Sequence, residues 1–226
     1  TSAGLQAIET LTARGININA TLLFAVERYR EVVEHWLRGL ERRLDNGLEI
    51  AGIASVASFF VSRVDSAVDR ELEAAGPEAL RRLGGRAAIA NAARAYTHYK
   101  EMRTSERFAR LEDAGASPQR LLWASTATKN PDYPDVMYVE GLAAPETVVT
   151  LPPATLAAFR DHGRVGDAIE TAMDTANGVL EGLDEAGVSL DIVTERLEQQ
   201  GVAAFTQSYD HLLKTLAERR TDLAAA

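Results

Sequence analysis

The sequence predicts an α/β fold in which parallel strands alternate with helices. Short segments rich in β-branched and aromatic residues recur four times between residues 16 and 151, and amphipathic helical patterns separate them. Glycine or proline marks most of the boundaries. Strands that are separated by helices pair in parallel, and right-handed crossovers close them into a barrel or spread them into a doubly wound sheet. The pattern alone does not decide between these two architectures.

The first half of the chain contains two of the four expected strands. Residues 16–24 are β-rich and largely apolar, and residues 50–64 are rich in Val, Ile, Phe and Ser. Apolar residues at helical spacing predict helices at 4–13, 26–44, 66–74 and 86–113. Each expected strand is therefore followed by at least one helix.

The second half contains two shorter strands and a helical tail. The expected elements are strands at 120–125 and 147–151, with a short helix at 135–142 between them. After Pro152 and Pro153 the pattern is helical only, with helices at 154–162, 165–186, 190–199 and 202–219. Gly201 is expected to separate the last two. We therefore expect an α/β part at residues 1–163 and a C-terminal helical extension at 164–226 that packs on it.

Composition and charge exclude several classes of function. The 226 residues carry a formal net charge of −9, so no basic surplus is available to neutralise the phosphates of a nucleic acid. Cysteine is absent, which excludes disulfides and thiolate metal sites, and the four histidines lack the spacing of a metal site. No apolar segment approaches the roughly 18 residues of a membrane span. We expect a cytoplasmic protein without a nucleic-acid, membrane or metal partner.

The first expected strand carries a polar stripe. Asn17, Asn19 and Thr21 occupy alternate positions, so their side chains should point to one face of the sheet. The short side chains of Asn19 and Thr21 could orient a substrate hydroxyl or a catalytic water there. A polar layer that is hydrogen-bonded within the fold explains the pattern equally well.

Lys129 is the candidate for ligand binding among the three lysines of the chain. Lys100 and Lys214 lie on polar faces of expected helices, where a solvated lysine is the ordinary interpretation. Lys129 follows the third strand, where ligands bind in parallel α/β folds, in a loop that also holds Ser125, Thr126, Thr128 and Asn130. It could form an imine with a carbonyl substrate or hold a phosphate as a fixed positive charge. A polar loop that only turns the chain is the remaining alternative.

Two charged residues, Arg63 and Asp65, follow a pair of phenylalanines at the end of the second expected strand. Arg63 could reach an anion, or it could pair with Asp65 and brace the neighbouring loops, and we favour the bracing role. Asp65 and Asp69 are expected on a charged, solvated helix surface, so neither is assigned as a general acid.

Several segments of the sequence resemble the transaldolase family. They are residues 1–8 (TSAGLQAI), 15–24 (GININATLLF), 58–65 (SFFVSRVD) and 122–130 (LWASTATKN). The resemblance covers essentially the whole chain. The version of the motif at residues 122–130 is similar to that of the longer bacterial transaldolases, including actinobacterial ones. It implies an (α/β)₈ TIM barrel in which the four expected strands are the fifth to eighth and the N-terminal half is absent. Thr1 matches the threonine of the family's Schiff-base lysine motif, so that lysine would lie four residues before this chain.

The resemblance also implies roles for single residues. Asn19 and Thr21 match the pair that orients the substrate and the catalytic water. Ser125 and Lys129 match the residues that hold the sugar phosphate, where arginine is the common family residue at the second position. Arg63 matches an arginine that braces the active end or contacts the phosphate. A second phosphate-binding arginine has no secure match, and the candidates are Arg160 and Arg164.

The activity implied by the resemblance is transfer of a dihydroxyacetone unit from sedoheptulose 7-phosphate to glyceraldehyde 3-phosphate, without a metal or organic cofactor. The alternatives are an aldolase that acts on fructose 6-phosphate and a non-catalytic phosphate-binding fragment. A chain without the nucleophilic lysine is expected to be inactive by itself. A half-barrel exposes two strand edges, which predicts either a partner that supplies the N-terminal half or self-association as a homo-oligomer.

Overall fold

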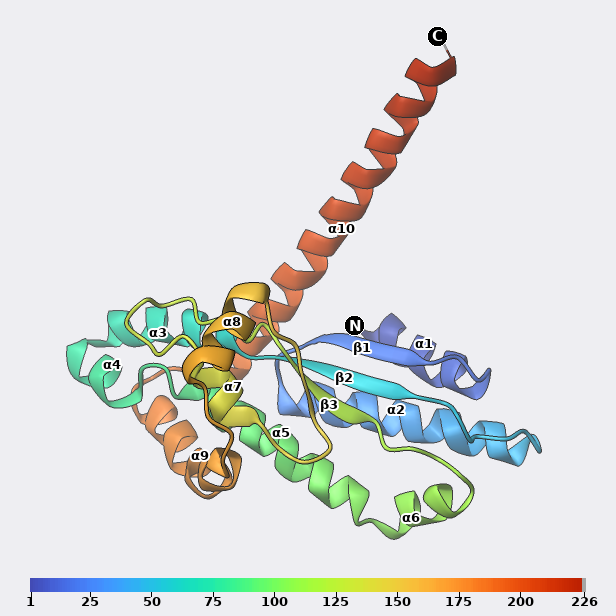
Figure 1. The fold of residues 1–226 in the computed structure, drawn as a ribbon, viewed down its shortest axis with the longest axis horizontal. Coiled ribbons are helices and arrows are strands. Elements are labelled where there is room, and N and C mark those ends of the chain that lie inside the picture. The colour runs from blue at the N-terminus through green and yellow to red at the C-terminus, as the bar shows by residue number, and fades with distance from the viewer. Residues whose placement is uncertain (225–226) are drawn as a thin grey trace.

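The computed structural model describes residues 1–224 and contains a four-stranded, fully parallel sheet (Figure 1). Its strands are β1 (Ile18–Leu23), β2 (Ser55–Phe60), β3 (Arg120–Ala124) and β4 (Val148–Val149). They are hydrogen-bonded in the order β1-β2-β3-β4, which follows the chain without reversal. A doubly wound sheet reverses its strand order at a switch point. The predicted α/β fold with a parallel sheet is confirmed, and the sequential strand order differs from that of a doubly wound sheet.

Ten helices surround this sheet within the described part of the chain. They are α1 (Ser2–Ala13), α2 (Val26–Asp45), α3 (Ser62–Ala75), α4 (Pro77–Leu83), α5 (Ala87–Arg103), α6 (Glu106–Asp113), α7 (Met137–Leu142), α8 (Pro153–His162), α9 (Ala168–Glu185) and α10 (Leu190–Ala224). Helix α2 contacts β1 and β2, and α5 contacts β3, so both lie on the same side of the sheet (Figure 1). Within residues 1–224, no helix combines the length and apolarity that crossing a membrane requires.

The two faces of the sheet differ in their side chains. On the side covered by α2 and α5, Ala57 and Leu121 lie opposite each other, as do Phe59 and Trp123, and all four are 0% exposed. The opposite face carries Asn19 on β1, Ser58 on β2 with its partner Leu122 on β3, and Val148 on β4. The hydrophobic core therefore lies between the sheet and the helices, and the second face carries both polar and apolar side chains.

Helix α2 illustrates the packing on the helix-covered side of the sheet. Its apolar residues recur every three or four positions, and Tyr29, Val33, Trp36 and Leu40 are all at most 3% exposed. Gly39 lies on the side that meets α1, where an added Cβ would come within 2.6 Å of the Cβ of Thr12. The absence of a side chain at this position allows the two helices to approach closely.

Residues 50–64 were expected to hold a strand and the loop after it, but the end of this segment is helical. Strand β2 ends at Phe60 and α3 already begins at Ser62, so the residues that follow lie in the first turn of a helix. Val64, Val68 and Leu72 are spaced four residues apart and are all 0% exposed, which is helical rather than strand periodicity. The helical pattern therefore starts before residue 66, where we expected it.

The prediction of two helices separated at Gly201 was wrong, because α10 runs through this residue without a break. A Cβ at Gly201 would lie 3.1 Å from Cδ2 of Leu22 in β1. Glycine thus permits close approach of α10 to the strand, and it does not end the helix here. Farther along, α10 projects away from the sheet (Figure 1), and Phe205, Tyr209 and Leu216 are more than half exposed.

Candidate functional site

The carboxyl ends of β2 and β3 bring two serines together. Beyond the paired strands, the amide of Val61 donates to the carbonyl of Ala124 and that of Ser62 donates to the carbonyl of Ser125, each at 3.0 Å. The hydroxyl oxygens of Ser62 and Ser125 are 2.9 Å apart. Ser125 has a φ of 58°, in a region that non-glycine residues rarely adopt and that costs roughly 1 to 3 kcal/mol. The surrounding contacts hold Ser125 in this conformation at the carboxyl end of the sheet.

Arg63 lies beside this serine pair, at the start of α3. Its side chain is exposed, and its guanidinium carbon is 5.1 Å from the centroid of the Phe60 ring, within the range of a cation–π contact. Asp65 points into the protein interior and binds other groups. The bracing pair that we favoured for Arg63 is therefore wrong, and within residues 1–224 no carboxylate pairs with this guanidinium.

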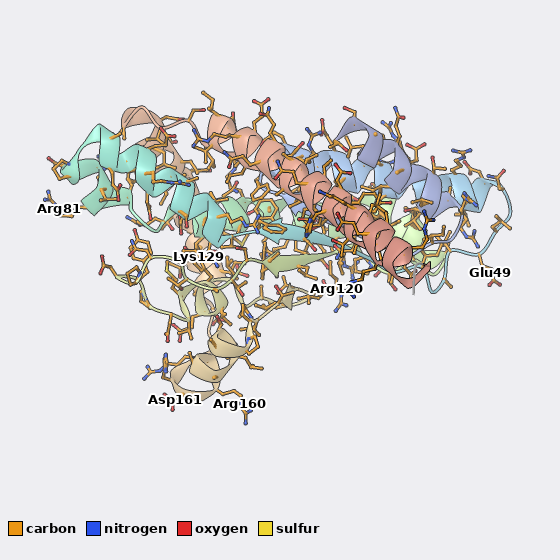
Figure 2. All side chains as sticks on the ribbon, turned by 90° about the horizontal axis from the view of Figure 1, so that it is seen from above. Glu49, Arg81, Arg120, Lys129, Arg160 and Asp161 are labelled. Carbon is orange, nitrogen blue, oxygen red and sulfur yellow. The ribbon has the colours of Figure 1, made fainter. Side chains whose placement is uncertain are left out.

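Lys129 is exposed in the loop between β3 and α7, and Figure 2 shows it at the opposite end of β3 from Arg120. The loop is fixed on both sides of the lysine. The Thr128 hydroxyl donates to the carbonyl of Pro134 at 2.9 Å, and the carbonyl of Asn130 accepts from the amide of Tyr133 at 3.2 Å. Among the described residues, the Lys129 ammonium has no hydrogen-bond or ion-pair partner. A structured loop thus holds a positive charge that is available to bind an anion.

The hydroxyl groups of this loop have different partners. The Thr126 side chain is buried and donates to the carbonyl of Thr150, while Thr128 is bound to Pro134. Ser125 contacts the hydroxyl of Ser62, and one of these two hydroxyls keeps its proton for another acceptor. The sequence left open which hydroxyl of the loop faces a ligand, and these contacts favour Ser125.

The surroundings of the other lysines and of the two candidate arginines suit anion binding less well than those of Lys129. Lys100 on α5 lies 3.5 Å from Glu170, and Lys214 on α10 lies 3.9 Å from Glu218. Figure 2 shows Arg160 at the outer end of α8, away from Lys129. Arg164 is exposed, and its backbone amide donates to Glu140. The structure brings neither arginine to Lys129.

Asn19 and Thr21 line a cavity of about 300 Å³ between β1, α1 and α10. The amide oxygen of Asn19 accepts a 2.7 Å hydrogen bond from Ser58 on the neighbouring strand. Asn17, by contrast, accepts from the backbone amide of Ala54 at 2.9 Å and so joins two strands at their amino ends. The polar stripe therefore divides into one structural residue and two residues that border open space.

Asp65 is buried, which corrects the expectation that it lies on a solvated helix surface. It is 1% exposed and accepts hydrogen bonds from the amide of Ala88 at 2.7 Å and the hydroxyl of Tyr138 at 2.9 Å. Burial raises the pKa of Asp65 from 3.8 to about 7, although these two hydrogen bonds act to lower it, and the charge of nearby Asp69 raises it further. The position of Asp65 beside the apolar residues Val64 and Val68 was the signal for its burial.

Replacement of Asp65 by asparagine should remove a pH dependence of stability. The folded pKa lies above the unfolded value, so the neutral acid stabilises the fold fully below about pH 4, and this contribution is lost as the pH rises through 7. The loss can reach about 4 kcal/mol for three pH units. Urea unfolding of both proteins at pH 4.5 and 7.5 should show the free energy falling in the wild type relative to Asp65→Asn. Parallel changes in the two proteins would contradict this assignment.

Comparison with known proteins identifies the family of this chain. The family model described as transaldolase/fructose-6-phosphate aldolase matches residues 1–216. The chain belongs to this family. It is 49% identical over 220 residues to a transaldolase of Parafrankia sp., covering 97% of this chain and 60% of the relative. It is 46% identical over 216 residues to transaldolase 2 of Streptomyces coelicolor, covering 95% of this chain and 58% of the relative.

A transaldolase of Saccharopolyspora erythraea gives a similar result, with 48% identity over 220 residues, 97% of this chain and 60% of the relative. The chain thus spans about three fifths of the length of the curated relatives that it matches. In this member of the transaldolase/fructose-6-phosphate aldolase family, the serine pair, Arg63 and the Lys129 loop all lie at the carboxyl ends of the strands. In parallel α/β folds, ligands bind at that end of the strands.

Proposed function

We propose that this chain supplies the sugar-phosphate-binding end of a transaldolase. The whole enzyme would transfer a dihydroxyacetone unit from sedoheptulose 7-phosphate to glyceraldehyde 3-phosphate through a lysine Schiff base. The observation that carries the proposal is that Ser125, Arg63 and Lys129 all follow the carboxyl ends of the adjacent parallel strands β2 and β3, in a chain that belongs to this family.

These groups suit a phosphate. The hydroxyls of Ser62 and Ser125 and two unpaired cations can donate to its oxygens, and the first turn of α3 adds the positive end of a helix dipole. Lys129 stands where arginine is common in the family. It supplies the same charge, but as a compact ammonium rather than a planar fork. The Arg63 side chain would be held in place by its contact with Phe60.

Asn19 and Thr21 are proposed to orient the substrate and the catalytic water. Both border the cavity beside β1, and the hydrogen bond from Ser58 fixes the amide of Asn19 on the face of the sheet that no helix of the α2 and α5 layer covers. In the proposed enzyme they would act as hydrogen-bonding groups near the reacting carbon atoms.

We further propose that the four strands are the fifth to eighth of an (α/β)₈ barrel whose N-terminal half lies outside these residues. The division would be residues 1–163 for the barrel and 164–226 for the helical extension. Three features support this: the sequential strand order, the polar groups of Asn19 and Ser58 on the second face of the sheet, and β1 and β4, which have one pairing partner each within the described chain. The exposed apolar residues of α10 would be covered in the complete protein.

The Schiff-base lysine would then lie outside residues 1–226, because none of the three lysines here lies on a strand. On this proposal the 226 residues alone are inactive. A variant of the function, release of the three-carbon unit to water, would make the protein a fructose 6-phosphate aldolase, and the family description includes both activities.

The test is borohydride trapping in the encoded protein, with whatever residues flank this segment. A lysine amine that attacks the C2 ketone of fructose 6-phosphate releases water and forms an imine, which borohydride reduces to a stable secondary amine. We expect one adduct, on a lysine outside residues 1–226. The first cleavage releases glyceraldehyde 3-phosphate and leaves the three-carbon unit on the lysine, so continued release should require erythrose 4-phosphate to accept that unit. An adduct on Lys129 would overturn its phosphate role. Equally fast release without an acceptor would favour the aldolase.

A further inference from the structure

Two acid–tyrosine contacts connect α3 to the segment that follows β3. Asp65 and Asp69 lie one turn apart on α3, and both are at most 8% exposed. Asp65 accepts from the hydroxyl of Tyr138 on α7, and Asp69 accepts from the hydroxyl of Tyr133 in the Lys129 loop, each at 2.9 Å. The second contact joins the loop itself to α3, and we call it the Asp69–Tyr133 latch.

A glycine turn between α4 and α5 contacts both residues of the latch. Asp69 uses its other carboxylate oxygen to accept from the amide of Gly85 at 3.0 Å. A Cβ at Gly85 would lie 2.8 Å from the ring of Tyr133, and one at Gly84 would lie 3.0 Å from its hydroxyl oxygen. Gly85 also has a φ of 69°, which favours glycine. The turn, the carboxylate and the tyrosine ring therefore form one packed unit.

The latch lies close to Lys129 along the chain. The amide of Tyr133 donates to the carbonyl of Asn130, the residue directly after Lys129, and Asn130 also accepts from the amide of Asp132 at 3.0 Å. Together with the hydrogen bond from Thr128 to the carbonyl of Pro134, this tight turn encloses Lys129 on both sides, so we expect the segment to move as a unit. A displacement of the Tyr133 ring would therefore displace Lys129.

Helix α3 carries one side of the proposed phosphate site and also the two acids. Its first turn provides Ser62, Arg63 and Asp65, and its second turn provides Asp69. A helix of 14 residues is a rigid element, so the latch fixes the Lys129 loop to the same body that places Arg63. Without it, two cations that repel each other would separate more easily before a phosphate binds.

We propose that Tyr133 and Asp69 are positioning residues that hold the Lys129 loop against α3 and thereby set the affinity for the phosphate group of the substrate. This inference rests on the proposed role of Lys129. Neither residue needs to touch the sugar phosphate, because each acts through the position of the loop.

The experiment measures the dissociation constant of fructose 6-phosphate by calorimetry on the encoded protein and its variants. Tyr133→Phe removes the hydroxyl and keeps the ring against the glycine turn, and we expect a five- to tenfold weaker complex, the effect of about one hydrogen bond. The matched control is Tyr99→Phe, which removes a 3.1 Å contact with Glu146 elsewhere and should leave the constant unchanged. Asp69→Asn can still accept from Gly85 and donate to Tyr133, so it should bind within about twofold of the wild type.

A double variant separates positioning from general structural damage. In the Lys129→Ala background, Tyr133→Phe should have no further effect on binding if it acts through Lys129. Equal affinity of Tyr133→Phe and the wild type, or the full loss repeated in the Lys129→Ala background, would overturn the latch. If Lys129→Ala itself binds as tightly as the wild type, the proposed role of Lys129 in phosphate binding is contradicted, whatever Tyr133→Phe shows.

Discussion

Replacement of Gly39 by valine is expected to lower the free energy of unfolding by about 3 kcal/mol. An added Cβ would lie 2.6 Å from the Cβ of Thr12 and 2.8 Å from the carbonyl oxygen of Glu9, both on α1. The carbonyl belongs to the helix backbone, so the clash is relieved when α1 moves away from α2. That movement would also disturb Leu5, which α1 contributes to the core.

Gly178 provides a matched control for this substitution. It also lies inside a helix, α9, but an added Cβ meets no atom within 4 Å. Gly178→Val should therefore stay within about 0.5 kcal/mol of the wild type, since valine is a slightly better helix former than glycine. Urea unfolding followed by circular dichroism measures both variants. Equal losses in the two would show that α1 and α2 are not held by close approach at Gly39.

Much of the fold could be predicted because each element has a strong local pattern. All four strands lie within the expected ranges. Each is a short apolar segment between two helical patterns, and strands separated by helices leave little choice but parallel pairing. The start of α3 was missed because the apolar residues Val61 and Val64 extend the strand composition into the helix. The continuity of α10 was missed because Gly201 is explained by its approach to Leu22, a contact far apart in the sequence.

The site could be predicted in part. Asn19, Thr21, Ser125 and Lys129 were selected from strand alternation and from the polar loop after a strand, and the structure places them on the polar face or at the carboxyl ends of the sheet. The burial of Asp65 could not be read from charge patterning, because acids on a helix are usually solvated. Its partners Ala88 and Tyr138 come from other parts of the chain.

The proposed phosphate role of Lys129 leads to the second large expected effect. Lys129→Ala should weaken the binding of fructose 6-phosphate about 10- to 100-fold, roughly the contribution of a charge-assisted hydrogen bond. The ammonium has no partner among the described residues, so its removal breaks no contact that holds the fold. Lys129→Arg keeps the charge that is common in the family and should retain binding. Lys100→Ala is the matched control, because Lys100 is also an exposed lysine but pairs with Glu170 on α9.

The most direct measurement is calorimetric titration of the encoded protein with fructose 6-phosphate, in the wild type and in Lys129→Ala, Lys129→Arg and Lys100→Ala. A phosphate site at the carboxyl ends of β2 and β3 predicts that Lys129→Ala weakens binding 10- to 100-fold. Lys129→Arg and Lys100→Ala should bind nearly as tightly as the wild type. Unchanged affinity in Lys129→Ala, or an equal loss in Lys100→Ala, would contradict the phosphate site.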